Sequence, residues 1–234
     1  MIEIRRGNER GHADHGWLQS FHSFSFADYY DPRHVQFGAL RVLNEDRVRA
    51  GAGFPTHSHQ NMEIISYVLE GALEHKDSLG NGSVIHPGDV QRMSAGTGVR
   101  HSEFNSSASS VLHFLQIWLL PNVRDIAPGY EERTFDVAQK RARLRLIASP
   151  DGRDGSVTVH QDVFLYAGLF DGEEQAVLPL RPGRLGYLHV ARGSLQANGA
   201  TLAAGDAIKA TGVAELTIAQ GRRAEVLAFD LPAA

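Results

Sequence analysis

The chain contains no cysteine, so disulfide bonds and thiolate metal sites are excluded, which suits a reducing compartment. It has no run of basic residues, and a net charge of −4 with a pI near 6.3 gives no electrostatic reason to expect a nucleic acid. No apolar stretch approaches the length that spans a membrane, and residues 1–6 lack the apolar core of a signal peptide. These absences predict a cytoplasmic protein with no nucleic-acid or membrane partner.

The hydrophobic pattern indicates strands and turns. The 234 residues, 42% hydrophobic and 21% charged, suffice for one large globular domain or two small ones. His22–Phe26 alternates polar and aromatic residues, Gly38–Asp46 reads as a short strand that ends in a polar turn, and Val111–Leu120 is apolar on both faces, as in a buried central strand. Short strands separated by glycine turns predict an all-β antiparallel barrel of the jelly-roll kind.

A second series of strand patterns begins near residue 143 and weakly repeats the first. In both halves Gly-Asp follows a glycine-bounded strand: Gly71 precedes Gly88-Asp89, and Gly193 precedes Gly205-Asp206. This echo predicts two β-barrels in one chain, over residues 1–122 and 123–234. Only the first half contains paired histidines, so the second does not use the same ligands.

Two short stretches carry the residues most suited to chemistry. Ten of the twelve histidines lie in the first 113 residues, and two of them form the pair His57-Ser-His59. Residues two apart on a strand share a face, so His57 and His59 would point one way, and His101 and Glu103 would do the same on another strand. Facing strands would then offer three nitrogens and one oxygen to a divalent first-row metal.

The spacing of these residues resembles the two motifs of the cupins. The first motif is matched by Gly51, His57, His59, Glu63 and Gly71, and the second by Gly88-Asp89, Gly98, His101 and Asn105, with Gly96 where proline is common. Within the cupins, the stretches His22–Pro32 and Ala95–Glu103 are similar to the pirin family, in particular its bacterial quercetin 2,3-dioxygenase-like branch. The resemblance implies a bicupin whose metal is bound only in the N-terminal half, by His57, His59, His101 and Glu103.

Four protein ligands on an ion that accepts six would leave two positions open for chemistry. Imidazole suits several metals alike; Fe(II) is the favoured expectation, with Zn, Co, Ni, Mn or Cu as alternatives. Glu103 has two possible roles, fourth ligand or a base that takes the substrate proton. In many cupins the glutamate of the first motif, here Glu63, is itself a ligand. We expect Glu103 to be the ligand and Glu63 to orient a histidine by accepting its N–H.

The other histidines and aromatics have simpler interpretations. Phe54, three residues before His57, is a candidate for the wall of a substrate pocket, and His113 is expected to be a hydrogen-bonded core residue. Structural or surface positions are expected for the remaining lone histidines: His12, His15, His34, His75, His86, His160 and His189. The aromatics Phe21, Phe24, Phe26, Tyr29 and Tyr30 could form a flavonoid pocket, but sealing of the barrel or packing between the two barrels is expected for most of them.

The resemblance implies a metal-dependent dioxygenase that opens the heterocyclic ring of a flavonol such as quercetin with O₂ and releases CO. Substrate and O₂ would be its partners, and a monomer is expected. Two alternatives stay open at this stage. One is a non-enzymatic, metal-bearing regulator that binds a partner protein and reports the redox state of its iron. The other is a metal cupin that acts on a different small planar enol.

Overall fold

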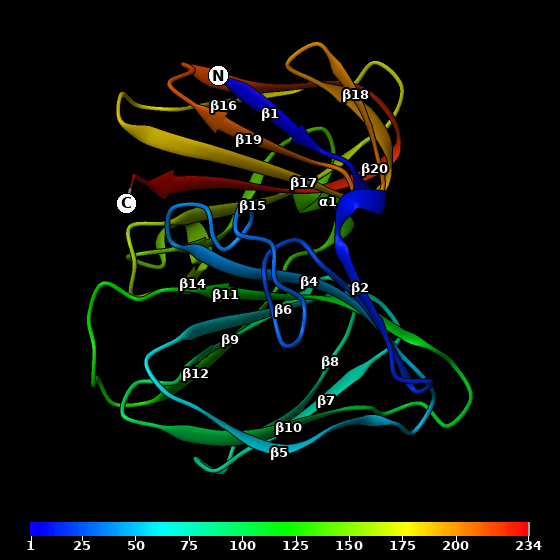
Figure 1. Ribbon diagram of the computed structural model, residues 1–234, viewed down its shortest axis with the longest axis vertical. Helices are drawn as coiled ribbons and strands as arrows, with labels where there is room; N and C mark the ends of the chain where they lie inside the picture. Colours follow the sequence, from blue (N-terminus) through cyan, green and yellow to red (C-terminus); the bar gives the residue numbers. More distant parts are fainter. Residues whose placement is uncertain (234) are drawn as a thin grey trace. The chain divides into compact units, whose positions relative to one another are not determined.

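The structure is a computed structural model that describes residues 1–233. The chain forms two compact units (Figure 1). The first, here called the N-terminal unit, comprises Gly11–Thr134 and Val157–Gln161; the second, the C-terminal unit, comprises Met1–Arg10, Phe135–Ser156 and the chain from Asp162 onward. No helix among the described residues is long and apolar enough to cross a membrane.

Two antiparallel sheets make up the N-terminal unit. One has the strand order β12-β9-β6-β11-β4-β3-β2 and the other β5-β10-β7-β8. Figure 1 shows β5 and β10 in a layer that faces the layer of β11 and β6. The strand bounds are β2 Gly11–Asp14, β3 Leu18–His22, β4 Leu40–Val48, β5 Gly53–His59, β6 Glu63–Glu70, β7 Leu73–Asp77, β8 Gly82–Ile85, β9 Asp89–Ser94, β10 Val99–Asn105, β11 Leu112–Leu119, β12 Gly129–Thr134 and β14 Val157–Thr158.

The core of the N-terminal unit follows from strands that are buried on both faces. β11 lies between β4 and β6 and is buried at seven of its eight positions, as its apolar sequence predicts. The sequence predicted a short strand that ends in a polar turn at Asp46. In the structure β4 continues to Val48, and Asn44, Glu45 and Asp46 are all buried within it. An apolar cluster that includes Leu18, Val48, Val68, Leu73, Leu112 and Phe114 closes one part of the barrel interior.

The expected strand His22–Phe26 is wrong. β3 ends at His22, and the chain then turns, because Ser25 is held by local bonds rather than by a strand neighbour: its N–H donates to the His34 carbonyl at 2.7 Å and its hydroxyl lies 3.0 Å from the Asp31 carbonyl. The Arg41 guanidinium donates to the Ser25 carbonyl at 2.7 Å. This folded loop places Phe26 and Tyr29 beside the barrel opening rather than along a sheet.

The C-terminal unit is built on one antiparallel sheet with the order β1-β19-β17-β20-β15-β13, beside which β16 pairs with β20 and β18 with β17. Its core is an apolar cluster that includes Phe170, Leu188, Ile208, Leu216 and Val226. The bounds are β1 Ile2–Arg5, η1 Gly7–Glu9, α1 Val137–Lys140, β13 Arg145–Ser149, η2 Arg153–Gly155, β15 Phe164–Phe170, β16 Ala176–Pro179, β17 Arg184–Ala197, β18 Ala200–Ala203, β19 Ala207–Thr211 and β20 Glu215–Pro232.

The units divide the chain differently from the expected ranges 1–122 and 123–234. β1 pairs with β19 over four residues, so the first ten residues belong to the C-terminal unit. β12 pairs with β9 over six residues, so the N-terminal unit extends past residue 122 to Thr134. Pairings this distant in sequence leave no local pattern at a domain boundary.

At Gly53 the backbone of β5 passes close to that of β10. A Cβ here would lie 2.5 Å from Phe104 Cα and would also overlap the Glu103 carbonyl oxygen. We expect Gly53→Ala to destabilise the protein by about 2 kcal/mol, because the added methyl forces the two strands apart. In thermal unfolding this corresponds to a lower Tm by roughly 4–8 °C. Gly82→Ala on β8 is the matched control, since its Cβ would meet nothing closer than 3.8 Å. Equal Tm values for the two variants would contradict the close approach.

Candidate metal centre and its pocket

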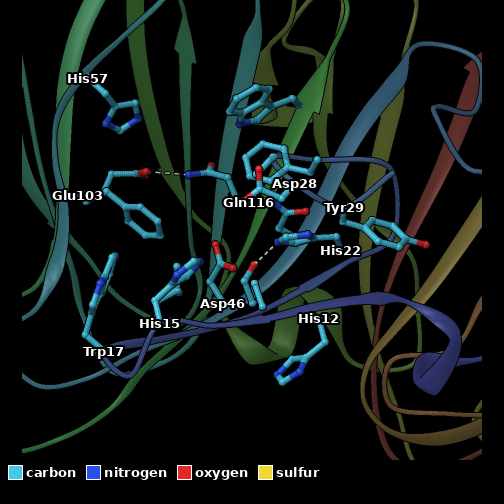
Figure 2. Close-up of a pocket in the computed structure, with 18 of the residues that line it drawn as sticks. His12, His15, Trp17, His22, Asp28, Tyr29, Asp46, His57, Glu103 and Gln116 are labelled. Atoms are coloured by element: carbon cyan, nitrogen blue, oxygen red, sulfur yellow. Dashed lines mark hydrogen bonds between the residues drawn. The ribbon is translucent and has the colours of Figure 1, made fainter. Parts of the chain in front are cut away.

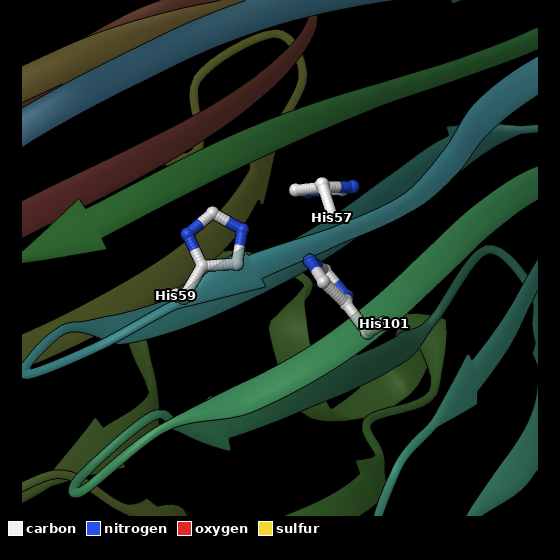
Figure 3. A group of neighbouring side chains, drawn as sticks. All are labelled: His57, His59 and His101. Atoms are coloured by element: carbon white, nitrogen blue, oxygen red, sulfur yellow. The ribbon is translucent and has the colours of Figure 1, made fainter.

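Three histidines converge from two paired strands. β5 carries His57 and His59, and β10 carries His101, which lies directly opposite His57 in the antiparallel register. Their ring centroids are 4.5, 4.8 and 4.9 Å apart, and one ring nitrogen from each lies within 4.8 Å of the others. Figure 3 shows the three rings turned toward a common point. We call His57, His59 and His101 the histidine group.

Burial keeps two imidazoles of the histidine group, those of His59 and His101, uncharged at neutral pH. Burial, and then the neighbouring His57, lower the pKa of His59 to about 4. Burial, and then His57, His59 and His75, lower the pKa of His101 to about 2. Both ring nitrogens of His101 are buried with no hydrogen-bond partner among residues 1–233. Neutral, unprotonated imidazole is the form that binds a divalent first-row metal, so this donor set fits such an ion.

Glu103 is buried and held by two polar side chains. It follows His101 by two residues on β10, across a register shift that places it opposite Phe54. Ser66 Oγ lies 3.1 Å from Glu103 Oε1, and Gln116 Nε2 donates to Oε2 at 2.7 Å (Figure 2). Burial raises the pKa of Glu103 to about 7, a rise that the bond from Ser66 opposes. Its carboxylate groups with His101 and His75 within 4.8 Å, rather than with His57 and His59.

Glu63 lies among other partners. Its carboxylate accepts from Ser94 Oγ at 2.9 Å and from the His160 backbone N–H at 3.2 Å, and it lies 3.3 Å from His160 Nδ1. It does contact a histidine, as the sequence suggested, but His160 is not in the histidine group. The structure therefore brings three of the expected ligands together, places Glu103 beside His101, and leaves Glu63 in a separate network.

His75 was expected to be an ordinary structural residue, and its position was missed. It lies opposite Glu103 in the register of β7 with β10, and its ring centroid is 5.3 Å from that of His101. Its Nε2 is 3.3 Å from Asp77 Oδ2. The alternation His75-Lys-Asp77 was readable as one strand face, but only the pairing of β7 with β10 shows that this face meets Glu103.

A cavity of about 630 Å³ opens beside the histidine group, within the size range of small-molecule sites. His57, His59 and Glu103 line it, and so does Phe54, the residue that the sequence suggested for a pocket wall. Figure 2 shows His57 and Glu103 to one side of the pocket, with Asp46 and His22 farther across it. Other lining residues include His12, His15, Trp17, Phe26, Tyr29 and Trp118.

Several of these lining residues depart from their expected positions. His12 and His15 were expected to be structural or surface residues, and both border the cavity. Phe26 and Tyr29, expected to seal the barrel, also face it. In contrast, His113 is a core residue with Nε2 2.9 Å from Glu45 Oε1, as expected.

Asp46 is a second buried carboxyl in the cavity wall, and burial raises its pKa to about 7. The unfolded chain gives up this proton near pH 4, so the free energy of unfolding should fall as pH rises from 4 to 7. Asp46→Asn cannot ionise. We expect it to stabilise the metal-free protein by roughly 2–4 kcal/mol more at pH 8 than at pH 4, measured by urea unfolding.

Asp31→Asn is the control of opposite sign, because bonds from Arg33 lower the pKa of Asp31. An Asp46→Asn variant with the same change in stability at both pH values would contradict the assignment.

Comparisons with known proteins agree with this architecture. Residues 3–119 match the family model described as Pirin, and residues 146–231 match the quercetinase C-terminal cupin domain. Quercetin 2,3-dioxygenase of Escherichia coli K12 is 47% identical over 232 residues, which cover 99% of each chain. The crystal structure of YhhW from E. coli covers 100% of this chain and 99% of that one with a TM-score of 0.96 at 47% identity. A nickel(II) complex of the bacterial pirin YhhW covers both chains fully, with a TM-score of 0.95 at 47% identity. The chain therefore belongs to the pirin family of two-domain cupins.

Proposed function

We propose that this protein is a metal-dependent dioxygenase that opens the heterocyclic ring of flavonols such as quercetin with O₂ and releases CO. The observation that carries the proposal is the histidine group, two of whose members, His57 and His59, line a cavity large enough for a three-ring planar molecule. The name of the 47% identical E. coli relative supports the same activity.

In this proposal His57, His59, His101 and Glu103 hold one divalent metal ion. The bound ion would act as a Lewis acid that favours the deprotonated form of the flavonol 3-hydroxyl. Fe(II) is the favoured metal, and the nickel in the related YhhW complex shows that a pirin accepts another divalent ion. The expected monomer and cytoplasmic location stay predictions.

Glu103 has the properties of a proton acceptor as well as those of a ligand. Burial raises the pKa of Glu103 to about 7 in the metal-free protein, and a bound cation would lower it, so that the carboxylate, the form that accepts a proton, is present at neutral pH. Gln116 and Ser66 each hold one of its oxygens, and each carboxylate oxygen can accept a second hydrogen bond from a substrate hydroxyl at the cavity wall. Glu103 would then take the 3-hydroxyl proton, which leaves the electron-rich enolate that O₂ attacks.

Aromatic side chains in the cavity wall would orient the substrate. Trp17 and Phe54 meet edge to face with centroids 5.2 Å apart, and Trp118 packs against His59 with ring centroids 4.9 Å apart. Rings at these positions bind a planar ligand through its faces and edges, and they exclude water from the reacting oxygens.

We expect His57→Ala to abolish the activity. The purified, metal-loaded wild-type protein should consume quercetin, seen as loss of flavonol absorbance, and release CO. Removal of one metal ligand should lower kcat/KM by roughly 100-fold or more. His86→Ala is the matched control, because its side chain is 61% exposed. Turnover without CO release, or faster turnover of another planar enol, would contradict flavonol ring opening as the native reaction.

Glu103→Gln and Glu63→Gln separate the two candidate carboxylates. We expect Glu103→Gln to weaken metal binding by roughly tenfold or more and to lower kcat by about 100-fold, because it removes both a ligand and a base. Glu63→Gln should keep the metal and lose only folding stability, since its partners are Ser94 and His160. Metal content after dialysis and the Tm distinguish the two. Retained metal in Glu103→Gln with lost metal in Glu63→Gln would reverse the assignment.

A further inference from the structure

A row of polar side chains crosses the inner face of the seven-stranded sheet of the N-terminal unit. Strand register places Gln116 of β11 between Ser66 of β6 and Asn44 of β4, and Asn44 opposite His22 of β3. The row therefore runs from the partners of Glu103 to the far side of the cavity. Gln116, Asn44 and His22 all line that cavity.

Asp46 follows Asn44 by two residues on β4, so the two side chains share a face of the strand. Asp46 lies directly opposite Ser20 of β3. Its side chain is only 4% exposed, yet it borders the cavity. Ser20 hydrogen-bonds the Asp46 carboxyl, and the same hydroxyl lies 2.8 Å from His22 Nε2. Figure 2 shows Asp46 and His22 close together on that side.

The carboxyl of Asp46 is incompletely satisfied. Among residues 1–233 the side chains that act on it are Ser20 and Glu45, neither of which is a cation, and its Oδ1 has no hydrogen-bond partner. Burial of such an oxygen costs free energy unless something bonds it. An unpartnered buried oxygen in a native structure therefore calls for an explanation, and this one borders a cavity. A ligand in the cavity is the natural source of that bond.

A metal ion is the other species that a carboxylate could bind, and the surroundings do not favour it. Within the described part of the chain, the sets of three or more metal-ligating side chains close enough to share an ion are the histidine group and the His75, His101, Glu103 set. Asp46 belongs to neither. Its immediate partner is a serine hydroxyl, which suits hydrogen bonding to a neutral group.

We propose that Asp46, positioned by Ser20, is a second recognition point of the cavity and binds a hydroxyl of the substrate remote from the histidine group. The proposal rests on the flavonol activity proposed above and narrows its substrate class to flavonols hydroxylated away from the 3-position. The histidine group and Glu103 hold the 3-hydroxyl end, the aromatic walls hold the ring system, and Asp46 Oδ1 bonds the distant hydroxyl.

Three flavonols that differ only in ring hydroxyls test this. The probes are 3-hydroxyflavone, galangin, which adds hydroxyls on the fused ring, and quercetin, which adds two more on the pendant ring. Binding to metal-loaded protein without O₂ can be followed by fluorescence, because both tryptophans of the chain, Trp17 and Trp118, line the cavity. In wild-type protein, either the step from 3-hydroxyflavone to galangin or the step from galangin to quercetin should tighten binding by roughly tenfold.

Asp46→Leu should abolish that step, because the hydrogen bond to the added hydroxyl is lost. Affinity for 3-hydroxyflavone should stay within about twofold, because this probe has no remote hydroxyl for Asp46 to bind. Asp46→Asn, which can still bond a hydroxyl, should keep most of the step, and Ser20→Ala should weaken it. Glu45→Gln is the matched control: Glu45 is a buried acid on the same strand that faces His113 rather than the cavity.

The outcomes separate the two proposals. Equal losses for all three flavonols in Asp46→Leu, unchanged steps in that variant, or a wild-type protein that binds the three equally would overturn the role of Asp46 and leave flavonol binding intact. A wild-type protein that binds none of them would overturn the proposed function as well.

Discussion

The antiparallel register of β5 with β10 is the constraint on which the site depends. It sets His101 opposite His57 and keeps His59 on the same face. Because side chains alternate along a strand, a slip of one residue would turn His101 away from the group and bring Arg100 or Ser102 in its place. The register shift after His101 then places Glu103 opposite Phe54. The proposed metal ligands and the Phe54 side of the pocket wall therefore come from one pairing.

Burial has opposite consequences for the two kinds of group at this pairing. It disfavours the charged form of imidazole, so the pKa values of His59 and His101 fall, and each neutral ring keeps one nitrogen that carries no proton. It also disfavours carboxylate, so the pKa of Glu103 rises toward neutrality. The same dry interior thus prepares ligands that need no deprotonation and an acid that can exchange a proton near pH 7. A bound cation would further lower the pKa of these histidines and would also lower the pKa of Glu103, against the effect of burial.

The sequence predicts those parts of the site that a two-residue period encodes. His57-x-His59 and His101-x-Glu103 could be placed on strand faces without any knowledge of the fold, and the buried strand around Phe114 was equally readable. Asp46 was not predictable, because consecutive polar residues near a strand end usually form a turn. They lie inside a strand here because one face borders a cavity. Such a cavity exists only after β3, β4 and β11 have paired, and no local pattern records those pairings.

The C-terminal unit shows why the barrel fold alone does not make the site. Its sheet is also antiparallel, with β17 paired to β20 along most of its length, but its core cluster is made of leucine, isoleucine, valine, alanine and phenylalanine. Both sets of metal-ligating side chains found in residues 1–233 belong to the N-terminal unit. The fold provides facing strands in either case. Of the strands that the structure describes, only those of the N-terminal unit bring metal-ligating side chains together beside an open cavity, and burial of such polar groups costs free energy that a bound ligand would offset.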